Sequence, residues 1–76
     1  MQVIHLGSID LGDGVLATEA WLSDSPFVLI QTRMGDRQVK SRLDLQKRMF
    51  IDPLPGTRTE AGLAELVVSV QEQLAA

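Results

Sequence analysis

The sequence predicts an α+β fold, in which an antiparallel meander sheet of four or five strands precedes one C-terminal helix packed on one face. The first 45 residues are rich in β-branched and aliphatic side chains, and residues that favour turns interrupt them at three places. Two of these turns contain an Asp-Gly or Gly-Asp pair between apolar segments, which is a strong hairpin signal. Residues 57–76 instead carry apolar side chains at helical spacing.

The turn residues set the expected boundaries of each element. Gly12-Asp13-Gly14 separates the first two segments, Ser23-Asp24-Ser25-Pro26 the next two, and Gly35-Asp36 the last two. The prolines at 53 and 55 end any later strand, because proline has no N–H to donate to a sheet. We therefore expect a single domain, residues 1–76, with strands at about 2–11, 15–22, 27–34 and 37–45, a helix at about 58–75, and 48–51 as a short fifth strand or an extension of the fourth.

The second hairpin has a register in which both strands agree on the buried side. With Gly35-Asp36 as a two-residue loop, Met34 opposes Arg37, and opposed residues of an antiparallel pair point to the same side. The expected inner face holds Val28, Ile30, Thr32, Val39 and Leu43. The expected outer face holds Phe27, Leu29, Gln31, Arg33, Gln38, Lys40, Arg42 and Asp44.

Two arrangements of the first hairpin fit the sequence. With Asp13-Gly14 as the loop, the opposed pairs are Leu11 with Leu16, Ile9 with Thr18, and Gly7 with Ala20. This register places Ile4 and Leu6 on the outer side, beside Trp21. A bulge at Gly7 would instead return Ile4 and Leu6 to the inner side, because one residue of slip exchanges the two faces of a strand.

The closing helix is the longest periodic stretch of the chain. Thr57 is its expected N-cap, with Glu60 three residues later forming a capping box, and Thr59 is the alternative cap. The main apolar stripe consists of Leu63, Leu66, Val67, Val70 and Leu74. A second stripe of small residues lies beside it and consists of Ala61, Ala64, Val68 and Ala75.

The dimensions of these elements predict a partner. A helix is about 10 Å wide, whereas four or five strands span about 19–24 Å. One helix would therefore cover about half of one sheet face and leave apolar surface exposed, which is typical of an interface. The chain has 76 residues and no cysteine, so disulfides cannot supplement its small core. We expect a homodimer or another obligate protein partner, and the alternative is a self-sufficient monomer in which strand curvature closes the sheet around the helix.

Charge is unevenly distributed along the chain. Residues 1–32 contain no lysine or arginine, and six of the seven basic residues lie within 33–48, although the net charge is −3. The acidic segments can neutralise the basic one within or between subunits, or the basic segment can form an anion-binding surface. Neither a signal peptide nor a membrane-spanning apolar segment is visible, so we expect a cytoplasmic protein without membrane contact.

No residue pattern indicates catalysis, a cofactor or a metal. His5 is the only histidine, and it is expected at the surface or a strand edge because no base–nucleophile arrangement surrounds it. A metal site would have to rely on His5 and carboxylates without any recognised ligand spacing. Gly7, Gly12 and Gly14 lack the Lys-Ser ending of a phosphate-binding loop and do not lead into a helix. We therefore expect a protein that is not an enzyme.

One segment resembles HicB-type antitoxins. Residues 49–56 read MFIDPLPG and are followed by Thr59-Glu60-Ala61, and in that family a strand, a Pro/Leu/Pro/Gly turn and an acidic helix start follow one another. The similarity covers less than a third of the chain, its Asp-Pro order departs from the family, and the preceding strands do not align. It therefore implies no specific function here.

The function that these observations favour is protein–protein interaction. The expected binding residues lie on the outer side of the sheet and comprise Arg33, Lys40, Arg42, Phe27, Leu29 and Trp21, with the basic side chains contacting an acidic partner. Small domains without chemistry of their own often serve as inhibitors, antitoxins or accessory subunits, including those of phages and mobile elements. The alternative is a nucleic-acid-associated regulator that uses the same basic face, although most such proteins are basic overall and this one has a pI near 4.8.

Overall fold

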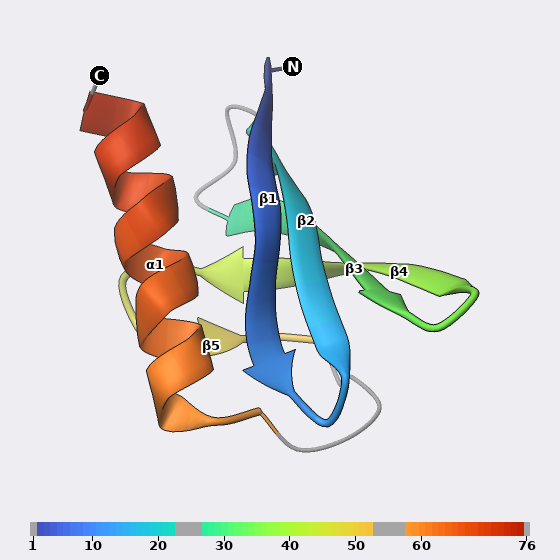
Figure 1. Ribbon diagram of the computed structural model, residues 1–76. Coiled ribbons are helices and arrows are strands. Elements are labelled where there is room, and N and C mark those ends of the chain that lie inside the picture. Colours follow the sequence, from blue (N-terminus) through green and yellow to red (C-terminus); the bar gives the residue numbers. More distant parts are fainter. Residues whose placement is uncertain (1, 23–26, 53–57, 76) are drawn as a thin grey trace.

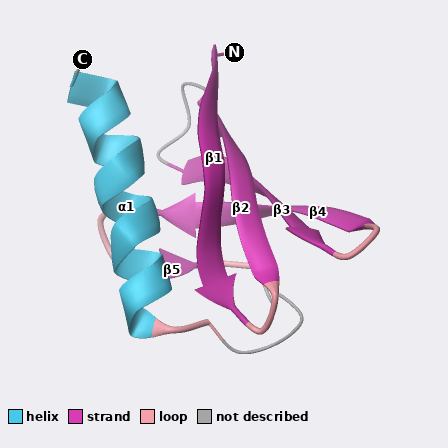
Figure 2. Cartoon of the chain, in the orientation of Figure 1, coloured by secondary structure: helices cyan, strands magenta, loops and turns pink. Residues whose placement is uncertain are grey.

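The computed structural model describes residues 2–22, 27–52 and 58–75 and shows the predicted α+β fold. Each strand pairs antiparallel with the next, so the order in the sheet equals the order in the chain (Figure 2). The fifth strand is separate from the fourth and has two residues. The elements are β1 (Gln2–Gly12), β2 (Val15–Leu22), β3 (Phe27–Met34), β4 (Arg37–Asp44), β5 (Met49–Phe50) and α1 (Glu60–Ala75).

The hairpin of β3 and β4 has the predicted register along its whole length. Met34 opposes Arg37, Thr32 opposes Val39, and the pairing continues without a shift to the far end of both strands. Gly35 has a φ of 60° while Asp36 stays outside the left-handed region, as a type II′ turn requires. The predicted inner residues are buried or half-buried, so the assignment of faces in this hairpin is confirmed.

Of the two arrangements of the first hairpin, the one without a bulge is wrong, and the bulge at Gly7 that returns Ile4 and Leu6 to the inner side is confirmed. Ile9 pairs with Ala17 rather than Thr18, and Ala20 pairs with Ile4 rather than Gly7. The pairing shifts between Gly12 and Asp10 and again between Ile9 and His5, and within the second shift Gly7 adopts a φ of 71° that other residues rarely reach. Even-numbered residues therefore face the core before Gly7 and odd-numbered ones after it, which buries Ile4, Ile9 and Leu11 together.

A second irregularity occurs in β2 at Thr18. The pairing with β3 shifts between Ala17 and Glu19, and the Thr18 hydroxyl donates a hydrogen bond of 3.2 Å to the Gln31 carbonyl. Ala17 and Ala20 are consequently both buried although they are three positions apart, which in a regular strand would put them on opposite faces. This shift brings Trp21 to the outer side of the sheet.

Curvature of the sheet, rather than the helix, encloses much of the core. Helix α1 lies beside β1 and contacts mainly that strand, whereas β3, β4 and β5 cross behind β1 and β2 (Figure 1). Ile30 of β3 and Leu43 of β4 are nevertheless completely buried. The expectation that half of the inner face stays exposed is therefore wrong for β3 and β4, because the strands bend over their own inner side chains.

The start of α1 is fixed to the end of β1. The predicted N-cap, Thr57, lies outside the described residues, and the described helix begins at Glu60 with Thr59 as its cap. The Thr59 hydroxyl accepts a hydrogen bond of 3.0 Å from the Gly62 N–H, and the Thr59 N–H donates to the Leu11 carbonyl at 3.0 Å. One threonine thus caps the helix and attaches it to the sheet.

The apolar stripe of α1 is buried along only part of its predicted length. Leu66, Val67 and Val70 are buried, and Leu63 packs against the core from a half-buried position. Leu74 is 50% exposed, so the predicted stripe is wrong at its last member.

Candidate functional site

The outer side of the sheet carries a continuous row of four side chains from four neighbouring strands. Val3 of β1 pairs with Trp21 of β2, Trp21 pairs with Leu29 of β3, and Leu29 pairs with Arg42 of β4. We call these residues the outer row. Val3 is 38% exposed, and Trp21 and Leu29 are half-buried without another described element packed over them. The outer row is therefore an apolar strip that ends in a cation.

Lys40 lies over this strip. It belongs to the next row of the sheet, where it pairs with Gln31, yet its Nζ lies 3.9 Å from the centroid of the Trp21 ring. Since β3 separates β2 from β4, the lysine side chain spans that strand to reach the indole. A cation over a tryptophan face is stabilised by about 0.5–1 kcal/mol at an exposed site. Lys40 thus holds a positive charge above the aromatic ring.

Arg42 is engaged by a carboxylate of its own chain. Asp52 accepts hydrogen bonds from Nη2 of Arg42 at 2.9 Å and from the Arg42 N–H at 2.8 Å. The Ile51 N–H donates to the Arg42 carbonyl at 2.9 Å, so this contact also fixes the chain that follows β5. Hydrogen bonds from the Arg42 side chain and backbone lower the pKa of Asp52, and the same side-chain bond raises the pKa of Arg42.

The Asp52–Arg42 pair makes a testable contribution to stability at low pH. Because the folded-state pKa of Asp52 is lowered, its stabilising effect is present above the ordinary aspartate pKa near 3.8 and is lost as pH falls through the folded value. We expect Arg42→Gln to return the Asp52 pKa toward 3.8, as measured by carboxyl-carbon NMR titration. Arg33→Gln is the control and should leave that pKa unchanged. An equally low Asp52 pKa in Arg42→Gln would contradict the assignment.

All six residues predicted for partner binding lie on the outer side of the sheet, but they do not form one cluster. Trp21, Leu29 and Arg42 belong to the outer row, and the Arg42 Cζ lies 6.0 Å from the centroid of the Phe27 ring. Lys40 joins them through Trp21. Arg33 is exposed and pairs with Leu16 two rows away, so it stands apart from the other five.

The sequence-based set omits Val3 and Asp52. Val3 lies beside Trp21 because of the bulge at Gly7. The register without a bulge places Val3 on the inner side of the sheet instead. Asp52 follows a chain reversal through β5, and its contact with Arg42 has no signature in the spacing of the two residues. The one hint of this contact in the sequence is that Arg42 and Asp52 have opposite charges and lie on either side of the expected short strand at 48–51.

The described residues show no metal centre. His5 is exposed, as expected, and its Nδ1 lies 3.8 Å from Oε1 of Glu19 on the neighbouring strand. Within residues 2–22, 27–52 and 58–75, no three histidine or carboxylate groups come close enough together to hold a metal ion. In the same part of the chain, the helix lacks the length and apolarity needed to cross a membrane.

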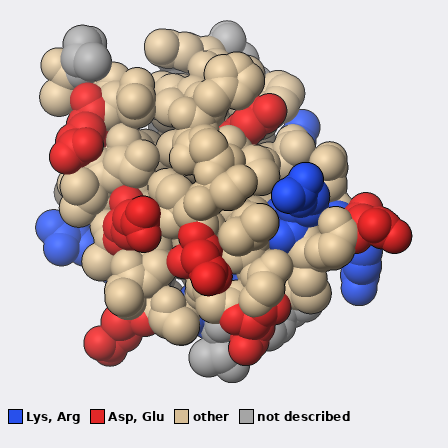
Figure 3. Space-filling model, viewed as in Figure 1, with Lys and Arg blue, Asp and Glu red and all other residues tan. Residues whose placement is uncertain are grey.

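Acidic side chains predominate on the face formed by α1 and β1 (Figure 3). In the view of Figure 3, acidic side chains are spread across α1 and β1, and basic ones lie mostly toward the margins. Helix α1 itself contains Glu60, Glu65 and Glu72 and no basic residue.

Comparison with models of protein families, with curated proteins and with solved structures found no match for this chain.

Proposed function

We propose that this chain is a non-enzymatic protein–protein interaction module that binds an acidic protein partner through the outer side of its sheet. The main support for this proposal is the outer row, in which Val3, Trp21 and Leu29 form an apolar strip that no described element covers. Tryptophan and arginine are the residues that most often dominate binding energy at protein interfaces. A partner that covers the strip would bury Trp21 and Leu29 at the centre of the contact.

The charges around the outer row favour an acidic partner. The positive charge of Arg42 is already balanced by Asp52, so the charge of Lys40, which lies over the Trp21 ring, is the one that a partner carboxylate can balance. A carboxylate of the partner that pairs with Lys40 would lie directly beside the Trp21 ring. Burial of a charge is favourable only when it is paired, so this position selects acidic over basic partners.

Such a module acts through the protein that it binds, as an inhibitor, an antitoxin-like protein or an accessory subunit. We also propose that it forms a homodimer. An exposed inner sheet face does not support a dimer, because Ile30 and Leu43 on that face are buried within one chain. Exposed apolar residues of α1 support it instead. Val68 is 51% exposed and continues the small-residue stripe of Ala61 and Ala64 along the outside of the helix, and Leu74, at the end of the main stripe, is 50% exposed.

The nucleic-acid alternative receives less support from the arrangement of charges. Carboxylates share the rows of the sheet with the cations: Glu19 lies in the row of Lys40, and Asp10 lies in the row of Arg33. A surface that follows a phosphate backbone would have to desolvate these acids beside the phosphates. Binding of a random oligonucleotide with a steep salt dependence would nevertheless favour this alternative over a protein partner.

Substitutions in and around the outer row test the proposal. We expect Leu29→Asp to weaken binding of the partner captured from native extract by about 2 kcal/mol or more, because it places a charge at the centre of the contact. Lys40→Glu should weaken it through repulsion, and added salt should then weaken binding less than in the wild type, because salt screens that repulsion. Arg48→Gln, in the turn between β4 and β5, is the matched control. Size-exclusion chromatography with light scattering measures the homodimer separately.

Two outcomes would contradict these proposals. Unchanged partner binding by a folded Leu29→Asp protein would remove the outer row from the interface. If the wild type is a monomer at micromolar concentration and Val68→Asp does not change its measured mass, the homodimer proposal is wrong. The proposal of an acidic protein partner would not be affected.

A further inference from the structure

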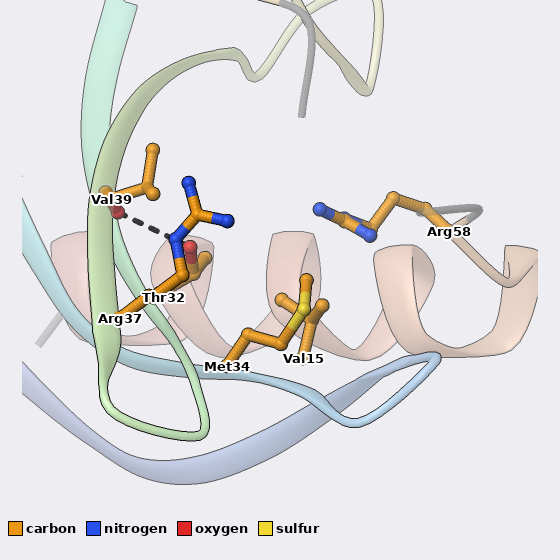
Figure 4. A pocket seen from close by; sticks show the side chains of 6 residues that line it. All are labelled: Val15, Thr32, Met34, Arg37, Val39 and Arg58. Atoms are coloured by element: carbon orange, nitrogen blue, oxygen red, sulfur yellow. Dashed lines mark hydrogen bonds between the residues drawn. The ribbon is translucent and has the colours of Figure 1, made fainter. Parts of the chain in front are cut away.

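A small cavity lies on the inner side of the sheet, away from the outer row. It borders the turn end of the β3–β4 hairpin and has a volume of about 10 Å³, which is room for about one water molecule. Arg37, the first residue of β4, and Arg58, two residues before α1, extend toward each other across it (Figure 4). The remaining described lining residues are Val15, Thr32, Met34 and Val39.

Arg58 has unmet hydrogen-bonding capacity in this cavity. Its Nε and both terminal nitrogens are out of contact with solvent, and none has a hydrogen-bond partner among the described residues. A guanidinium offers five N–H donors, and leaving buried donors of a charged group unpaired is costly. Removal of water lowers the pKa of Arg58, while the negative charge of Asp13 acts in the opposite direction. An acceptor group in the cavity would satisfy these donors.

The other lining residues restrict what that acceptor can be. No described lining residue is acidic, so the two arginines face each other without a carboxylate between them. The Thr32 hydroxyl already donates to the Val39 carbonyl at 3.2 Å, which leaves its oxygen free to accept rather than donate. Val15, Met34 and Val39 supply apolar walls. The cavity therefore combines two cationic donors with an apolar surround.

We propose that this cavity is a binding site for a carboxylate held between Arg37 and Arg58. A guanidinium donates two parallel hydrogen bonds to the two oxygens of a carboxylate, so two arginines that face each other can bind both edges of the group. The apolar walls suit the alkyl carbon that a carboxylate carries and a free phosphate lacks. The enclosed volume of about 10 Å³ is smaller than a carboxylate group, so binding requires Arg37, which is exposed at the hairpin turn, to move outward as the anion enters.

The carboxylate can come from a small free acid or from an acidic side chain, and the two sources share this chemistry. The site lies on the opposite side of the sheet from the outer row, so it does not depend on the proposed protein-binding face. Failure of one proposal leaves the other standing. Phosphate is the comparison anion, because it has the charge without the alkyl carbon.

NMR titration of the ¹⁵N-labelled protein in low-chloride buffer tests the site directly. The probes are acetate, butyrate, phosphate and glutamate blocked at both its amino and α-carboxyl groups, which mimics an acidic side chain. We expect saturable shifts of the Arg58 and Arg37 Nε–Hε signals with the carboxylates and weaker binding of phosphate. Tighter binding of blocked glutamate than of butyrate would assign the site to an acidic side chain, and the reverse order would assign it to a free acid.

Variants distinguish a site from general ionic effects. Arg58→Gln should raise the dissociation constant for the best carboxylate by about tenfold or more, the effect of losing a charged hydrogen bond. Asp13→Asn should lower it, because a competing negative charge near Arg58 is removed. Arg33→Gln, on the outer side, should leave it within about twofold, since it alters the net charge equally without touching the cavity. Non-saturating shifts of the wild-type Arg58 signal, or equal affinity in Arg37→Gln and Arg33→Gln, would overturn the proposal without relying on Arg58→Gln to fold.

Discussion

Replacement of Gly62 by alanine is expected to destabilise the protein by about 1–3 kcal/mol, the usual effect of forcing extra atoms into a packed site. In most helix interiors the same change is stabilising, because alanine has a helix propensity about 1 kcal/mol better than glycine. At position 62 a Cβ atom would lie 2.5 Å from the Asp10 carbonyl oxygen and 2.9 Å from the Leu11 Cα. Both are backbone atoms of β1, so neither can rotate away.

The helix would therefore have to move off β1, and the hydrogen bond between Thr59 and Leu11 would lengthen or break. Urea denaturation followed by circular dichroism measures the change in unfolding free energy. Ala64→Gly, at an exposed position of the same helix, is the matched control and should cost about 1 kcal/mol. Stabilisation by Gly62→Ala would show that the helix start does not approach the sheet this closely.

Leu66→Ala is expected to remove about 2–5 kcal/mol of stability, as deletion of a fully buried leucine side chain does elsewhere. A domain of this size has about 4–11 kcal/mol of stability in total. The variant should therefore be close to unfolding at room temperature. Leu74→Ala removes the same atoms from a side chain that is 50% exposed, and we expect a change within about 0.5 kcal/mol.

The same denaturation experiment compares the two leucines, with Leu74→Ala as the matched control. If Leu66→Ala and Leu74→Ala lowered the unfolding free energy equally, Leu74 would not lie at the surface of a monomer. If the loss for Leu74→Ala grew with protein concentration, the end of α1 would be buried between subunits instead, because a dimer is stabilised by mass action.

The β3–β4 hairpin was predictable because its turn and its alternation point to the same register. Gly35-Asp36 fixes the loop, and both strands then place apolar residues on one side without interruption. In the first hairpin the irregularities at Gly7 and Thr18 each reverse the alternation. A reversal cancels the periodic signal on which strand prediction depends, so the register without a bulge fits the sequence equally well until the three-dimensional packing selects the bulge.

The candidate site was predictable to a similar extent. Alternation along β3 and β4 placed Phe27, Leu29, Arg33, Lys40 and Arg42 on one side, and the structure agrees. The contacts among them were not predictable. The position of Lys40 over Trp21 requires a side chain to cross a strand, and the bond of Arg42 to Asp52 requires the chain to return after β5. Long flexible side chains choose such partners from the final geometry, which local sequence does not specify.

The attachment of Thr59 and Gly62 to the end of β1 also bears on how the chain folds. All strand pairs join neighbours in sequence, so the sheet can grow hairpin by hairpin through short loops. The contact of α1 with β1 instead joins residues separated by most of the chain. Closing so long a loop has a larger entropic cost than closing a hairpin, and rates fall as contacts become less local. We therefore expect the helix to dock after the hairpins have formed, and to close the structure when it does.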